Sequence, residues 1–277
     1  MVNSLSKKTS FFYTSILYIT GLAILFPIIW LIISSFRPQH EIVGSPYSLP
    51  QEMSVNNFIE LVNIPGFTAS LINSFSVAIL TTFICAVAAI PTGYLLARYS
   101  FSGRSFLRAF ALSGYLFAPA VLALPYFKIF GLMELIDSLF GIALSHTAFC
   151  LPFAVTISDL IFRSVPYSLE EVSMLDGHGF FSRLIRIVIP AAMYQVASLL
   201  ILIFIISWKE FYFAFLISSG VDTRTLPVLL ATLYGGEALN WHLVCALSTV
   251  IIMPSFLILI FAKPLKAIPL IGPGSRG

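Results

Sequence analysis

Very few residues of this chain could do chemistry. Only 10% of its 277 residues are charged, whereas 58% are hydrophobic and the mean hydropathy is +0.98. The four histidines show no metal-ligand spacing, and no HExxH, GxSxG or paired-cysteine pattern occurs. A GxxxxGK[ST] phosphate loop is also missing, so the chain cannot hydrolyse ATP by the usual means. We therefore expect no catalytic residue, no metal ligand and no cofactor bound by this chain.

Two charged residues interrupt a long apolar run. Lys209 and Glu210 lie within the stretch from about Ala191 to Ser218. Charges at that depth are costly unless they are paired or hydrated, and adjacent residues do not face each other on a helix. Two interpretations stay open: the residues line a translocation path or gate, or the helix bends or ends early and leaves both near the outer water.

Another charged residue, Asp159, lies near the inner end of a different apolar run. Arg163 follows it at i+4, the spacing at which helical side chains meet. An ion pair with Arg163, or simple solvation, therefore explains Asp159 better than a proton relay does.

The most polar segment between apolar runs extends from Glu171 to Gly177 and reads EVSMLDG. Ser168 and Glu171 fit a capping box, with Ser168 as the N-cap. Gly177 suits the left-handed position that ends a helix. The pattern predicts a helix of about two turns, followed by a second amphipathic piece that leads to Pro190 and the next apolar run.

This short helix carries an apolar stripe, because Leu169, Val172 and Leu175 recur at i, i+3 and i+6. A helix of this length is marginal in isolation and needs a surface to rest on. Two interpretations remain open. The helix lies on its own membrane bundle, or it docks into a cytoplasmic partner. Glu171 likewise either closes the capping box or presents its charge to that partner.

Six long apolar runs must position these residues. Only helices and closed barrels satisfy their backbone hydrogen bonds in lipid, and the runs are continuous rather than alternating, which excludes a barrel. The sequence therefore predicts an all-α membrane protein with six transmembrane helices and membrane lipid as its solvent. The predicted spans cover about residues 11–36, 69–97, 106–127, 139–162, 191–218 and 241–262.

Basic residues are distributed unevenly over the predicted loops. With the N-terminus inside, inner segments hold eleven of the fifteen, namely Lys7, Lys8, Arg98, Arg104, Arg108, Arg163, Arg183, Arg186, Lys263, Lys266 and Arg276. The positive-inside rule then predicts that both termini and the polar segment are cytoplasmic. The net charge of +3 follows from this bias and does not indicate nucleic-acid binding.

The predicted organisation is a single membrane domain. Residues 1–10 form a cytoplasmic N-terminal tail, residues 11–262 a six-span domain with a polar inner loop at about 163–190, and residues 263–277 a cytoplasmic C-terminal tail. The first apolar run is too long for a signal peptide, and no cleavage pattern follows it. The three cysteines, at positions 85, 150 and 245, fall inside spans, where they are expected to be small apolar filler.

The polar segment carries a family signature. The spacing Glu171-x₅-Gly177, followed by Ile187-x-Ile189-Pro190, resembles the cytoplasmic loop of ABC importer permeases, which forms a coupling helix held in a cleft of an ATPase subunit. Other motifs in the same order resemble the maltose-type carbohydrate permeases, specifically their shorter six-span subunit: Ser34-Ser35-Phe36-Arg37-Pro38, Ala97-Arg98, Phe101-x-Gly103-Arg104, Asp137, Trp208-x-Glu210-Phe211, Thr225-Leu226-Pro227-Val228 and Trp241.

The resemblance implies a type I importer fold in a bacterial inner membrane and a set of partners. These are a second permease subunit, two ATPase subunits that use ATP and Mg, and an extracytoplasmic binding protein that delivers a sugar, either a di- or oligosaccharide or a related glycoside. The implied coupling residues are Leu169, Glu171, Val172, Ser173, Leu175, Asp176, Gly177 and Pro190. One departure is that Val172-Ser173 replace the family's usual two alanines, which could alter the docking fit.

Two rival classes are also consistent with a polytopic membrane protein. A secondary transporter driven by an ion gradient would need ionisable groups along its path and, often, inverted repeats, whereas only Lys209 and Glu210 lie deep in a run. A non-transporting membrane scaffold would tolerate loss of Gly177 and would have no ATPase partner. An enzyme ranks last.

Overall fold

The computed structural model describes residues 7–114, 119–175, 177–235 and 239–261. These residues form helices joined by turns, with no strand among them. The chain divides into two compact units. The first comprises Met1–Pro65 with Leu230–Ile252, and the second comprises Gly66–Leu229 with Met253–Gly277. The predicted N-terminal tail lies largely outside the described residues and the C-terminal tail entirely so.

The first unit is built on α1 (Lys7–Ser34), α2 (Gln39–Gly44), α3 (Asn56–Val62) and most of α14 (Trp241–Phe261). Its organising residue is the fully buried Arg37, whose guanidinium donates to the Ser45 carbonyl at 2.9 Å and pairs with Glu41 at 3.2 Å. Asn57 donates to the carbonyls of Ser35 and Arg37. These bonds fix the turn that follows α1.

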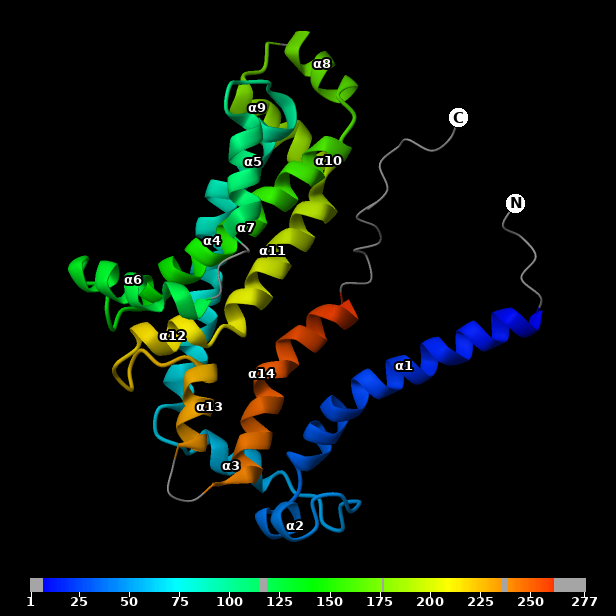
Figure 1. Ribbon diagram of the computed structural model, residues 1–277, viewed down its shortest axis with the longest axis vertical. Coiled ribbons are helices and arrows are strands. Elements are labelled where there is room, and N and C mark those ends of the chain that lie inside the picture. The colour runs from blue at the N-terminus through cyan, green and yellow to red at the C-terminus, as the bar shows by residue number, and fades with distance from the viewer. Residues whose placement is uncertain (1–6, 115–118, 176, 236–238, 262–277) are drawn as a thin grey trace. The chain divides into compact units, whose positions relative to one another are not determined.

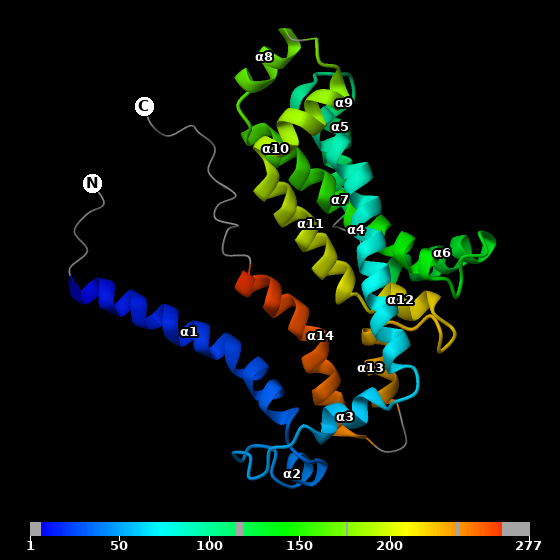
Figure 2. The same ribbon diagram turned by 180° about the vertical axis from the view of Figure 1, so that it is seen from behind.

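The second unit is built on three long helices, α4 (Phe67–Arg98), α7 (Leu139–Ser164) and α11 (Met193–Trp208), which pack side by side (Figures 1 and 2). One close approach is at Gly93, where a Cβ atom would overlap the Cβ of Ser158. Small residues such as Ala89 and Ala154 continue this contact, as expected of helices that associate in lipid through close packing rather than hydrophobic transfer.

The helices long and apolar enough to cross a membrane correspond to most of the predicted spans. Four described segments meet that standard singly: Phe12–Ser34, Phe67–Arg98, Leu139–Ser164 and Trp241–Ile258. A fifth span results if the bent pair Phe180–Ala191 and Met193–Trp208 counts as one. These five match the predicted first, second, fourth, sixth and fifth spans.

Two predicted spans are divided. Where one helix was expected over 106–127, the structure describes α5 (Arg104–Ser113) and α6 (Pro119–Leu132), on either side of residues outside the description. The predicted fifth span is wrong at its outer end, because α11 stops at Trp208 and a separate helix, α12 (Tyr212–Ile217), follows. The short helices α2, α3 and α13 (Leu226–Tyr234) lie in segments predicted as outer loops.

Hydrogen bonds to one carboxylate join two loops of the second unit. Asp137, which precedes α7, accepts hydrogen bonds from the Thr223 hydroxyl and from the backbone N–H groups of Gly220 and Ser219. These donors stabilise the carboxylate and lower the pKa of Asp137. The loop before α7 is thereby tied to the loop that follows α12.

Candidate coupling site

The predicted helix in the polar segment is present as α8 (Ser168–Leu175). The capping box is wrong, because the N–H of Glu171 donates to the carbonyl of Tyr167 at 3.1 Å. That bond is an ordinary i to i−4 helical bond, so Ser168 lies inside the helix and Tyr167 accepts its first bond. The carboxylate of Glu171 is therefore not needed to close the helix start, and its side chain is exposed.

The C-terminal end of α8 has a left-handed residue at Gly177, as the sequence predicted. Gly177 has a φ of +79°, and no atom lies within 4 Å of where its Cβ would be. The N–H of His178 donates to the Ser173 carbonyl and the N–H of Gly177 to the Met174 carbonyl, at 3.2 and 3.0 Å. This pair of bonds is the Schellman motif. Asp176 itself lies outside the described residues.

The apolar stripe of α8 faces outward. Leu169 is 46% exposed, Val172 63% and Leu175 89%. Ser173 is buried instead, on the other side of the helix. Within the chain as described, the stripe therefore does not rest on the protein's own helices, which removes the main support for the first of the two interpretations. The stripe is therefore available for contact with something outside this chain.

The face of α8 that does contact the bundle is held by a residue that the sequence did not single out. Glu170 is 0% exposed, and its carboxylate accepts hydrogen bonds from the Tyr94 hydroxyl and the Arg98 Nε, both at 2.5 Å. The sequence does show that Glu170 is an acid next to Glu171, and adjacent residues on a helix point in different directions. Nothing in the sequence alone paired it with the end of α4.

The chain beyond α8 forms a helical segment that is sharply bent before α11. The helix α9 (Phe180–Arg183), the π-helical turn η2 (Leu184–Val188) and α10 (Ile189–Ala191) form one continuous helical segment, bent by 90° from α11 at Ala192. Pro190 lies in α10, just before the bend. Pro190 was predicted to mark the entry to the fifth span, whereas it lies at the bend inside the pair of helical segments that makes up this span.

Asp159 is the centre of an ion cluster near the C-terminal end of α7. Its carboxylate pairs with Arg163 at 2.5 Å, as the i+4 spacing predicted, and with Arg108 of α5 at 3.0 Å. Because both partners are permanent cations, the carboxylate is a structural anchor between α5 and α7. A role as a proton relay has no support from this arrangement.

Lys209 and Glu210 lie at the break between α11 and α12, so the helix ends early as the second interpretation expected, but that interpretation placed both residues near water and only Lys209 is exposed. Lys209 is exposed, whereas the carboxylate of Glu210 lies 2.8 Å from Nε2 of the buried His146. The same carboxylate accepts the N–H groups of Phe213 and Ala214, at 3.0 and 3.2 Å, and so caps α12. His146 in turn lies 2.8 Å from the Ser207 hydroxyl.

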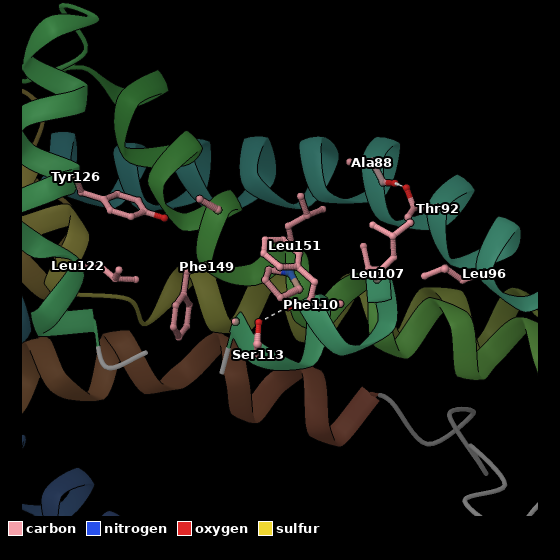
Figure 3. Close-up of a pocket in the computed structure, with 15 residues that line it drawn as sticks. Ala88, Thr92, Leu96, Leu107, Phe110, Ser113, Leu122, Tyr126, Phe149 and Leu151 are labelled. Atoms are coloured by element: carbon pink, nitrogen blue, oxygen red, sulfur yellow. Dashed lines mark hydrogen bonds between the residues drawn. The ribbon is translucent and has the colours of Figure 1, made fainter. Parts of the chain in front are cut away.

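A cavity of about 590 Å³ lies among α4, α5, α6 and α7 (Figure 3). Its walls are mainly aliphatic and aromatic, including Phe110 and Phe149. The hydroxyls of Thr92 and Ser113 already donate to the backbone carbonyls of Ala88 and Phe110. A sugar needs several free hydrogen-bonding groups as well as an apolar surface, so this cavity suits apolar side chains or lipid better than a sugar.

The family comparison agrees with the geometry of this site. Residues 89–265 match the family described as the binding-protein-dependent transport system inner membrane component. The chain belongs to this family. The match includes α8, the bend after it and the break between α11 and α12. The protein is thus an inner-membrane permease component of an ABC importer, a transport subunit rather than an enzyme.

Curated relatives cover most of the chain. It is 30% identical over 259 residues to the sulfoquinovosyl glycerol transport system permease protein SmoH of Agrobacterium fabrum, covering 93% of this chain and 90% of the relative. It is 29% identical to the trehalose/maltose transport system permease protein MalG of Thermococcus litoralis, covering 86% and 87%. The trehalose permease SugB of Mycobacterium tuberculosis is 27% identical, with 79% of each chain covered.

A solved structure shares the fold. A chain of a bacterial ABC transporter involved in the import of the acidic polysaccharide alginate superimposes with a TM-score of 0.79, at 19% identity, covering 96% of this chain and 100% of that one. The predicted type I importer permease fold is confirmed by this similarity.

Proposed function

We propose that this chain is one of two permease subunits that together form the path of a sugar importer, with the sugar a di- or oligosaccharide or a related glycoside. The similar proteins named above are described as permeases for trehalose, maltose and sulfoquinovosyl glycerol. This common chemistry of substrates supports a glycoside as the solute. The exposed stripe of α8 is the observation that carries the rest of the proposal.

The partner that fits α8 is an ATPase subunit. An eight-residue helix with Leu169, Val172 and Leu175 outward suits an apolar cleft, and a cation in the wall of that cleft would complement the exposed Glu171. Because this chain lacks a phosphate loop, the ATP and Mg belong to that partner. Closure of two ATPase subunits would move α8 and rock the helices between inward and outward openings.

The membrane orientation that this function requires agrees with the distribution of basic residues over the predicted loops. The basic residues beside α8 and those near both ends of the chain belong on the cytoplasmic side. Both termini and the α8 loop would then face the ATPase subunits, and an extracytoplasmic binding protein would deliver the sugar to the other side. We keep Lys209 and Glu210 as candidate path residues. Lys209 is the better candidate, because the carboxylate of Glu210 is already paired with His146.

Reconstitution of the whole complex tests this function. The chain would be co-expressed with its candidate second permease and ATPase, placed in proteoliposomes and supplied with the binding protein and labelled trehalose, maltose or other glycosides. The expected result is uptake that requires ATP inside the vesicle and the binding protein outside. Uptake that continues without ATP and stops when an ion gradient is dissipated would contradict the proposal.

A cross-link tests the docking surface itself. A Val172→Cys variant in otherwise cysteine-free protein should capture the ATPase subunit in intact cells, because Val172 is exposed on the stripe. The matched control is Leu124→Cys, on an exposed position of α6, which should not capture it. No capture at Val172 would remove the ATPase from the proposal.

A further inference from the structure

The buried face of α8 carries a charge where a charge is expensive. Glu170 is fully buried, and an ionised carboxylate without water needs strong partners. It has two: the Tyr94 hydroxyl at Oε2 and the Arg98 Nε at Oε1, both at 2.5 Å. Tyr94 is itself fully buried, and Arg98 is nearly so.

Arg98 extends the connection to the segment before α8. Its Nη2 donates to the carbonyl of Val165 at 2.6 Å, and its guanidinium lies over the Tyr167 ring, 5.7 Å from the centroid. One side chain at the end of α4 therefore contacts Val165 after α7, Tyr167 just before α8, and Glu170 of α8 itself. The rigid planar guanidinium suits such multiple donation.

The same end of α4 also holds the segment after α8. Arg183 of α9 donates to the Tyr99 hydroxyl at 2.6 Å. The Phe180 ring packs against the rings of Tyr94 and Tyr99, with centroids 5.1 and 6.0 Å apart. The loop that carries α8 is thus attached on both sides to the end of α4 and its C-cap residue Tyr99, whereas Val172 and Leu175 on its outward face are largely exposed.

We propose that the end of α4, through Tyr94, Arg98 and Tyr99, is the clamp by which movement of α8 reaches the transmembrane helices, with Glu170 and Arg183 as its positioning residues. This rests on the proposed function, because it supplies the connection between the ATPase-bound helix and the path. The adjacent acids divide the work: Glu171 faces the partner and Glu170 faces α4. Since α4 packs along α7 and α11, a pull on Glu170 is passed to the core of the unit.

The experiment compares Glu170→Gln with Glu171→Gln in the reconstituted complex. Both substitutions remove one charge and keep the side-chain shape. Glu170→Gln should leave the amount of co-purified ATPase unchanged and lower the sugar transported per ATP hydrolysed by about tenfold, because it deprives Arg98 of its buried counter-charge. Glu171→Gln should lower ATPase association and keep the transport-to-hydrolysis ratio of the complexes that form.

Two further variants separate coupling from folding. Tyr94→Phe keeps the ring packing and removes one hydrogen bond to Glu170, so it should lower the same ratio by about threefold to tenfold. Glu170→Asp keeps the charge and should recover part of the ratio lost in Glu170→Gln. An unchanged ratio in both Glu170→Gln and Tyr94→Phe would overturn the clamp. If the wild-type complex shows no ATP-dependent uptake, the proposed function fails instead, so the two failures are distinguishable.

Discussion

Two regions of the second unit each carry a pair of adjacent charged residues, and in each pair the two side chains have opposite environments. In α8, Glu170 is buried against α4 whereas Glu171 is exposed. At the break after α11, Glu210 is paired with the buried His146 whereas Lys209 is exposed. Neighbouring residues on a helix point in different directions, so each pair supplies one structural charge and one available charge.

The comparison also shows how the regions differ. The carboxylate of Glu170 is bound by cationic and phenolic side chains of another helix, which connects α8 to α4. The carboxylate of Glu210 is bound partly by backbone N–H groups of its own short helix, which fixes the break. The first region is built to pass on movement, and the second is built to hold a bend. The substitutions below test this difference, from the largest expected effect to the smallest.

The largest effect is expected at Gly177. Its φ of +79° is strongly unfavourable for a β-branched residue, so Gly177→Val should disrupt the end of α8. Transport by the reconstituted complex should fall by about tenfold or more, because a strain of about 1–2 kcal/mol per left-handed residue acts at the docking helix. Gly179→Val is the matched control, since Gly179 has a φ of −72° and open space at its Cβ. Equal transport in the two variants would contradict the role of the helix end.

The next effect concerns the break. Glu210→Ala removes the partner of His146 and the cap of α12, so it should destabilise the complex by about 2–3 kcal/mol. The measurement is the apparent thermal unfolding temperature in detergent, which should fall. Lys209→Ala should leave that temperature unchanged, since Lys209 is exposed. A change of KM for the sugar in Lys209→Ala would place Lys209 on the path, and an unchanged KM would remove it.

These two regions also show what the sequence could predict. The long helices followed from uninterrupted apolar runs, and the end of α8 followed from Gly177, because both depend on local properties of the chain. The stripe of Leu169, Val172 and Leu175 was also predictable, although its exposure was not. Glu170 was missed because its partners, Tyr94 and Arg98, lie more than 70 positions away in sequence.

The errors have the same physical origin. The capping box pattern at Ser168 and Glu171 was present in the sequence, but the helix begins one residue earlier and uses the Tyr167 carbonyl. The outer end of the fifth span was predicted as continuous because its composition is apolar, whereas the pairing of Glu210 with His146 across to α7 ends the helix. In both cases a tertiary contact or a single backbone bond decided between alternatives of similar local propensity.

A smaller effect is expected for Glu171→Lys, which reverses the exposed charge of α8. The apparent unfolding temperature should not change, because Glu171 has no part in closing the helix. Association with the ATPase subunit should weaken by about fivefold, the size of an exposed ion pair. The control is Glu52→Lys in the exposed segment after α2, which should leave association unchanged. Unaltered association in Glu171→Lys would mean that the stripe docks without the help of this charge.

The smallest effect is expected at Ser173. Ser173 is buried, and its hydroxyl has no hydrogen-bond partner among the described residues. An unpaired buried hydroxyl is destabilising, so Ser173→Ala should raise the apparent unfolding temperature slightly, by about 1 kcal/mol or less in stability. Val172→Ala, at an exposed position of the same helix, should instead weaken ATPase association and leave stability unchanged. The two positions thus separate along the same line as Glu170 and Glu171, one buried and one exposed. A loss of association in Ser173→Ala, or a loss of stability in Val172→Ala, would contradict that division of α8 into a held face and a docking face.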